Sequence, residues 1–143
     1  MAAGHIIRAT DAAHDLTVFT VVGAVDAAAV SDHIMAFLTG EPTPWVLWDI
    51  RAGSVTGLSL VDVIGIIKRA KPFAARRRGG RTAIVCAQPL DYAVSRMVQS
   101  VAEAMQIPFE MAVFRDHAEA RGWLHEIRRG EGSDGSSRPL AVS

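Results

Sequence analysis

The stretch WVLWDIRAGSVTGLS, residues 45–59, sets the expectation for the fold. Its first six residues form a nearly continuous apolar run, which is typical of a strand buried on both faces. Small and hydroxyl-bearing residues follow, and Ser59 stands where a side chain can cap the start of a helix. The stretch therefore predicts a strand over 45–50, a loop over 51–59, and a helix from about Ser59 to Lys71.

Further predicted strands and helices lie on both sides of this stretch. A hairpin is predicted near the amino terminus, where two β-rich segments are joined by the polar turn TDAAHD. Helical stripes of apolar residues follow, with Asp26 as an amino-terminal cap and Gly40 as a stop for the first of them. In chain order, the sequence predicts strands over 5–9, 16–25, 45–50, 81–87 and 108–115, and helices that begin after Asp26, near Ser59, at Pro89 and after Asp116.

The order ββαβαβαβα predicts an α/β fold. Strands separated by helices form a largely parallel sheet covered by helices, and the hairpin adds an antiparallel part. We therefore expect one mixed, mostly parallel sheet with an N-terminal β-hairpin and four helices. The domain is predicted to span residues 1–129, and the Gly- and Ser-rich residues 130–143 are predicted to form a flexible tail.

Length and composition narrow the class of protein. The chain has 143 residues, half of them hydrophobic, which suits a single domain with a core. Its formal net charge is zero, which disfavours a general nucleic-acid binder. One cysteine, no basic and apolar leader and no run of about 20 apolar residues predict a cytoplasmic protein without disulfide or stable membrane insertion. No metal or cofactor motif was identified.

Three segments carry a resemblance to a known family. VLWDIR (46–51), RTAIVCA (81–87) and especially FEMAVFRDHAEARGWL (109–124) resemble the SpoIIAA-like family. That family has the fold of STAS domains, named after sulfate transporters and anti-sigma-factor antagonists, and is linked to the lipid-binding SEC14 group. The resemblance covers about residues 5–127 and implies a non-enzymatic binding or regulatory module, for which no catalytic residue is assigned.

The family's phosphorylation site does not carry over to this chain. In anti-sigma-factor antagonists, a partner kinase phosphorylates the serine or threonine that directly follows an aspartate at the start of the second helix. SVTGL (54–58) matches that pattern in its last three residues only, with Ser54 at the aspartate position and Val55 at the phosphorylated position. The resemblance therefore implies a module without the usual acceptor serine, and Ser54, Thr56 and Ser59 remain candidate acceptors.

Ligands of parallel sheets usually bind at the carboxyl ends of the strands. The loops over 51–59, 87–91 and 115–119 are expected to meet there, and each leads into a helix amino terminus that favours an anion. The alternative is that these residues are only helix caps and surface arginines. The candidate ligand or partner-loop residues are Asp49, Arg51, Ser54, Thr56, Ser59 and Arg115.

Two further segments are candidates for contact. The second helix is apolar around more than one face, which predicts an intermolecular interface or, alternatively, deep burial. Residues 68–81 hold seven of the fifteen Lys and Arg residues and no acid, which predicts an anion-binding patch or, alternatively, a solvated helix end. The interface candidates are Leu60, Val63, Ile64 and Ile67; the patch candidates are Lys68, Arg69, Lys71, Arg76, Arg77 and Arg78.

Three hypotheses for function follow. The first is a STAS-like module that contacts another protein or a second copy of itself. The second is a SEC14-like carrier that holds a small amphiphile between the second helix and the sheet. The third is an enzyme that uses Asp49, Arg51 or Cys86, and it ranks last because no catalytic motif is present.

Overall fold

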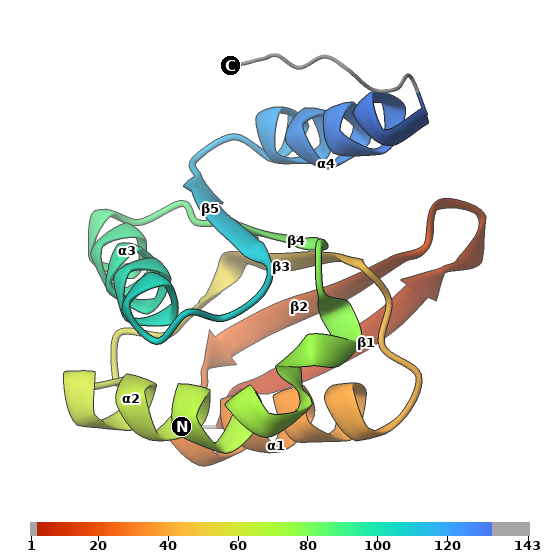
Figure 1. Cartoon of the computed structure of the whole chain (residues 1–143). Helices are drawn as coiled ribbons and strands as arrows, with labels where there is room; N and C mark the ends of the chain where they lie inside the picture. Colours follow the sequence, from red (N-terminus) through yellow and green to blue (C-terminus); the bar gives the residue numbers. More distant parts are fainter. Residues whose placement is uncertain (1–2, 133–143) are drawn as a thin grey trace.

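The structure, a computed structural model, describes residues 3–132. Within this range, apolar residues form the strands of a five-stranded sheet (Figure 1). The strands lie in chain order, β1 to β5; β1 is antiparallel to β2 and the other pairs are parallel. This confirms the predicted fold class and order of elements. The strands are β1 (His5–Asp11), β2 (Leu16–Ala24), β3 (Trp45–Ser54), β4 (Arg81–Val85) and β5 (Glu110–Phe114).

Four α-helices cover the sheet, and two short 3-10 helices join elements. Figure 1 shows α1, α2 and α3 on one side of the sheet and α4 on the other. The bounds are α1 (Ala27–Thr39), α2 (Leu60–Ala70), α3 (Pro89–Ala104), α4 (His117–Gly132), η1 (Ala12–His14) and η2 (Lys71–Arg77).

The helices create two cores, one on each face of the sheet. The larger core lies under α1, α2 and α3, and there the Phe19 ring stacks on Trp48 with ring centroids 4.4 Å apart. The smaller core lies under α4 and includes Leu47, Val85 and Leu124. Because successive residues of a strand point to opposite faces, both faces of the central strands are apolar, which explains their continuous apolar runs.

Side-chain caps fix where the helices start. The Asp26 carboxylate accepts a hydrogen bond from the Ala29 N–H at 2.9 Å, as the sequence predicts. Ser59 and Asp62 form a reciprocal capping box at the start of α2, which confirms Ser59 as a cap.

Strand β3 is longer than predicted. It continues from Ile50 through Ser54 because, past a register shift between Thr20 and Val22, its end pairs with the end of β2. Gly53 permits this close pairing, since a Cβ atom there would lie 2.6 Å from the Val21 carbonyl oxygen. The loop predicted over 51–59 is therefore only the five residues 55–59.

Other boundaries also differ from the expectation: β1 extends to Asp11, β4 ends at Val85, and β5 covers only Glu110–Phe114. Helix α2 ends at Ala70, one residue before the predicted end at Lys71, and η2 follows directly, with Pro72 in its first turn, where a missing N–H is tolerated. Helix α4 extends to Gly132, three residues beyond the predicted end of the domain at 129, and the rest of the predicted tail lies outside the described residues. No helix within residues 3–132 is long and apolar enough to cross a membrane.

Candidate functional site at the carboxyl edge of the sheet

The predicted loop residues lie on two different faces of the sheet. The alternation of β3 places Asp49 and Arg51 on the α4 face, where they interact electrostatically with His117 and Asp116. The Ser54 hydroxyl instead donates a hydrogen bond to the Asp91 carboxylate of α3 on the other face. The six candidates therefore do not form one site.

Asp49 and Arg51 form an ion pair with two side-chain hydrogen bonds. Arg51 Nε donates to Asp49 Oδ1 at 2.9 Å, and Arg51 Nη2 donates to Asp49 Oδ2 at 2.8 Å. These bonds hold the pKa of the Asp49 carboxyl below its usual value, although burial opposes the shift. Both carboxylate oxygens accept hydrogen bonds from Arg51, so Asp49 acts as a structural acceptor that fixes the Arg51 side chain.

This pair is expected to make stability depend on pH. A carboxyl whose folded-state pKa is lowered contributes stability above its unfolded pKa of about 3.9 and loses it as pH falls through the folded-state value. Asp49→Asn should therefore lower the free energy of unfolding by about 1 kcal/mol at pH 7, because Arg51 is partly exposed and solvent screens the pair. Denaturant melts at several pH values check this. A difference between the wild-type protein and the variant that persists undiminished at pH 2 would contradict it.

Asp91 organises the other face, and the sequence did not single it out. It lies in the first turn of α3 with only 2% of its surface exposed. Its Oδ1 accepts hydrogen bonds from the Ser54 hydroxyl at 3.0 Å and from the Val55 N–H at 2.8 Å. An acid in the first turn of a helix is a recognisable signal, but its partners come from a segment 36 and 37 residues away in the chain. Asp91 thus fixes the end of β3 against α3.

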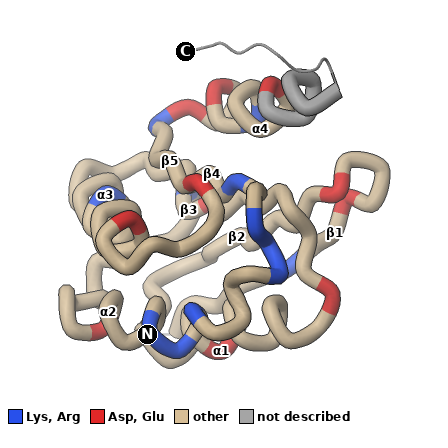
Figure 2. The backbone as a smooth tube through the Cα atoms, viewed as in Figure 1, with Lys and Arg blue, Asp and Glu red and all other residues tan. Residues whose placement is uncertain are grey.

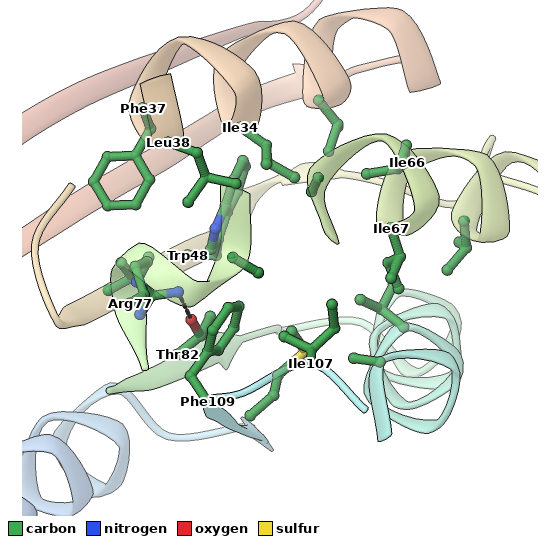
Figure 3. A pocket seen from close by; sticks show the side chains of 18 of the residues that line it. Ile34, Phe37, Leu38, Trp48, Ile66, Ile67, Arg77, Thr82, Ile107 and Phe109 are labelled. Atoms are coloured by element: carbon green, nitrogen blue, oxygen red, sulfur yellow. Dashed lines mark hydrogen bonds between the residues drawn. The ribbon is translucent and has the colours of Figure 1, made fainter. Parts of the chain in front are cut away.

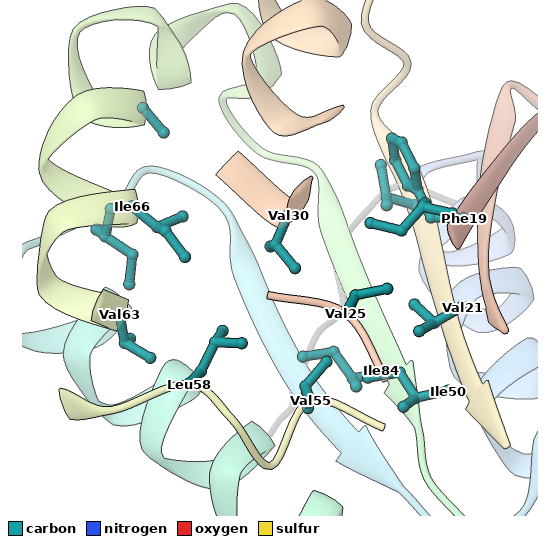
Figure 4. Packing of buried hydrophobic residues seen from close by; sticks show 14 of the residues in the cluster. Phe19, Val21, Val25, Val30, Ile50, Val55, Leu58, Val63, Ile66 and Ile84 are labelled. Carbon is teal, nitrogen blue, oxygen red and sulfur yellow. The ribbon is translucent and has the colours of Figure 1, made fainter. Parts of the chain in front are cut away.

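The loop over 55–59 turns its apolar residues inward and leaves its hydroxyl-bearing residues, Thr56 and Ser59, exposed. Figure 4 shows Val55 and Leu58 in the same core as Val63. Thr56 is exposed, and its N–H donates to the Ser54 hydroxyl oxygen at 3.2 Å. Of the candidate acceptors, Ser54 is bonded to Asp91 and Ser59 caps α2, whereas the Thr56 hydroxyl, on an exposed residue, lies 3.0 Å from the Ser54 hydroxyl.

The loops after β4 and β5 lie side by side at the carboxyl edge of the sheet, as the sequence predicts, because the two strands are parallel. The Arg115 guanidinium lies over the Tyr92 ring, 4.5 Å from its centroid, which links the β5 loop to α3. Cys86 is fully buried behind this edge, and burial raises the pKa of its thiol. A protonated, inaccessible thiol is a poor nucleophile. Within residues 3–132, no group of three or more potential ligand side chains could hold a metal ion.

Large apolar side chains are exposed on the first turns of α2 and α3. Leu60 and Ile64 of α2 are 53% and 37% exposed, so both remain candidates for the interface. Val63 and Ile67 were wrong as interface candidates, because they point into the core. Val61 and Leu90, which were not among the interface candidates, are 78% and 69% exposed. The carboxyl-edge patch is defined as Leu60, Val61, Ile64 and Leu90.

Lys and Arg concentrate in the basic segment that runs from α2 through η2 to the start of β4 (Figure 2). Arg77 was wrong as a patch residue, because only 4% of it is exposed. Arg69 donates hydrogen bonds to the Ser31 and Asp32 side chains of α1, and Arg76 donates one to the Leu38 carbonyl oxygen. The exposed residues among the patch candidates are Lys68, Arg69, Lys71, Arg76 and Arg78.

An apolar cavity of about 120 Å³ lies between the sheet and helices α1, α2 and α3. Figure 3 shows Ile34, Ile66 and Ile67 along its wall and Arg77 with Thr82 toward one end. A cavity of this size could hold several water molecules, but an apolar lining offers them few hydrogen-bond partners. It therefore favours an apolar occupant.

Comparison with known proteins places this geometry in a known fold. No protein-family model matches the chain, and no curated protein matches it. A crystal structure of an uncharacterised DUF3478-family protein with a SpoIIAA-like fold, from Shewanella loihica PV-4, superposes with a TM-score of 0.55 at 22% identity, covering 87% of this chain and 97% of that one. The chain has a SpoIIAA-like fold.

A second solved structure supports the same conclusion. An anti-sigma factor antagonist from Mycobacterium paratuberculosis matches with a TM-score of 0.52 at 16% identity, over 86% of this chain and 95% of that one. Within the SpoIIAA-like fold, the carboxyl edge of this chain combines the exposed apolar patch, the accessible Thr56 hydroxyl and the buried Asp91.

Proposed function

We propose that this chain is a non-enzymatic binding module that docks onto another protein through the carboxyl-edge patch. The observation that carries the proposal is the exposure of its four large apolar side chains, from 37% to 78%, at the starts of α2 and α3. Helices α2 and α3 pack on each other, and the bonds from Ser54 and Val55 to Asp91 tie the segment before α2 to α3. Apolar groups gathered on a surface are typical of protein interaction sites.

The groups that an enzyme would need are engaged elsewhere. Asp49 is paired with Arg51, Cys86 is buried, and Asp91 holds the loop in place. Rigid support of an exposed patch is what a docking surface needs, because less side-chain and loop entropy is lost on binding. The fold shared with an anti-sigma factor antagonist also supports a regulatory role through protein contacts.

The partner should offer an apolar groove or the apolar face of a helix. The four side chains of the patch would be the buried anchors, and the Thr56 hydroxyl would lie at the polar rim. Thr56 remains our candidate acceptor for phosphorylation, since a phosphate there would put negative charge beside the docking surface.

The proposal is tested by charge substitution within the patch. Val61→Asp and Leu90→Asp should each weaken association with the partner at least tenfold, because each places a charge in a desolvated contact. The control is Ala13→Asp, an exposed position in η1 at the opposite end of the sheet (Figure 1). Affinity purification from the host, followed by sedimentation of the purified complex, measures the change.

A partner must be retained by Ala13→Asp and lost by both patch variants for the proposal to hold. Sedimentation of the protein alone separates association with a second copy from association with a different protein. Equal retention of every partner by all three variants would contradict docking through the patch.

The cavity supports a second candidate function, a carrier of a small amphiphile. Its lining is almost wholly apolar, and it lies between α2 and the sheet, which is the location that the carrier hypothesis assigns to its ligand. Native mass spectrometry of protein purified from its host tests this, with a bound small molecule as the expected result. Detection of the ligand-free mass alone, before and after incubation with host lipid and metabolite extracts, would exclude it.

A further inference from the structure

The cavity has one polar end, formed by Arg77 of η2 and Thr82 of β4. Both residues line the cavity, and each is 4% exposed. Figure 3 shows the two side chains joined by a hydrogen bond beside Phe109. The remainder of the wall consists of aliphatic and aromatic residues such as Trp48 and Ile107.

Not every donor at this end has an acceptor. Arg77 Nε donates to the Thr43 carbonyl at 2.9 Å. Its Nη2 donates to the carbonyls of Pro44 and Arg81 at 2.9 and 3.0 Å. Its Nη1 donates to the Thr82 hydroxyl oxygen at 2.9 Å. A guanidinium has five N–H donors, so one N–H of Nη1 has no acceptor among the side chains and backbone that the structure describes.

Thr82 adds a second unused donor. Its hydroxyl oxygen accepts the bond from Arg77, and its own hydrogen has no acceptor in the described part of the chain. Buried donors without acceptors are rare in proteins and cost free energy. Two adjacent ones on a cavity wall therefore indicate an acceptor that the described residues do not supply.

The charge of Arg77 is also uncompensated. No ion pair among the described residues includes it, and its guanidinium lies 4.1 Å from the centroid of the Phe109 ring and 5.8 Å from that of Phe37. Burial lowers the pKa of Arg77 to about 9, so the side chain still carries its charge at neutral pH. A buried cation of this kind is stabilised by an anion that enters the cavity.

We propose that the cavity binds a small monocarboxylate, whose carboxylate accepts hydrogen bonds from Arg77 Nη1 and the Thr82 hydroxyl. The apolar body of the ligand would fill the space between Trp48 and Ile107. The cavity, at about 120 Å³, is somewhat smaller than the roughly 150 Å³ of an apolar cavity that accepts benzene, so the apolar body can be no larger than one benzene-sized ring. This inference rests on the carrier function and specifies the chemistry of its ligand.

Titration calorimetry at pH 7 with benzoate and its neutral counterpart benzyl alcohol tests the inference. The two probes have similar bodies, so a difference in affinity reports the carboxylate. We expect benzoate to bind about tenfold or more tightly than benzyl alcohol, because its charged acceptor meets the cation and both donors. Val98→Phe, which fills the cavity from α3, should abolish binding of both probes.

Arg77→Met should remove the preference for benzoate while leaving the apolar space. Should that variant not fold, the Arg77 guanidinium ¹⁵N–¹H resonances of the wild-type protein give the same information, since benzoate should shift them and benzyl alcohol should not. Equal or tighter binding of benzyl alcohol would overturn the carboxylate assignment but leave the carrier function intact. Failure of both probes to bind the folded wild-type protein would overturn the assignment and the cavity as a ligand site together.

Discussion

Replacement of Arg77 by alanine is expected to lower the free energy of unfolding by about 3 kcal/mol. The side chain donates to three carbonyl oxygens and to the Thr82 hydroxyl from a position that is only 4% exposed. These hydrogen bonds join η2 to β4 and to the segment before β3, so the loss of the bonds affects several elements at once. Chemical denaturation followed by circular dichroism measures the change.

The matched control for this prediction is Arg78→Ala. Arg78 directly follows Arg77 in the chain but is exposed, so its replacement should change stability by less than about 0.5 kcal/mol. Similar small effects at both positions would mean that Arg77 is solvated like its neighbour. That result would contradict both the buried network and the polar end of the cavity.

Asp91→Ala is expected to destabilise the protein by about 2 to 3 kcal/mol. The substitution removes the acceptor of the Val55 N–H, which is buried, and of the Ser54 hydroxyl. It also removes a negative charge from the first turn of α3, where the helix dipole favours it. Asp91→Asn should cost less, because an amide oxygen can still accept one of these bonds.

Hydrogen exchange separates the local effect of Asp91 from the global one. In Asp91→Ala, the Val55 amide should exchange faster than amides of the central strands, even after correction for the lower global stability. Glu103→Ala is the control, since Glu103 lies on the exposed side of the same helix. Unchanged protection of Val55 in Asp91→Ala would show that the loop is held by other contacts.

Much of this fold could be predicted because its signals are local. Apolar runs, helical spacing and caps such as Asp26 and Ser59 depend on neighbours in the chain, and the structure confirms them. The boundary at Ser54 was missed because it depends on the end of β2, which lies about thirty residues earlier in the chain. No local pattern reports such a pairing.

The candidate site was predicted only in part, for the same reason. Leu60 and Val63 are equally apolar, and only the packing of α2 decides that the first is exposed and the second buried. Arg77 has the same charge as its exposed neighbours, but the turn of η2 directs it inward toward three carbonyl oxygens. Asp91 could not be recognised as the organiser of the loop, because its partners are distant in sequence.

Site-specific photocrosslinking in the host is the most direct test of docking through the carboxyl-edge patch. A photoreactive amino acid is placed at residue 61 or 90 in the patch, or at residue 13 at the opposite end of the sheet. We expect one discrete adduct with a protein partner from each patch position and none from residue 13. Adducts from residue 13 alone, or no adduct from either patch position under conditions in which the partner co-purifies, would contradict it.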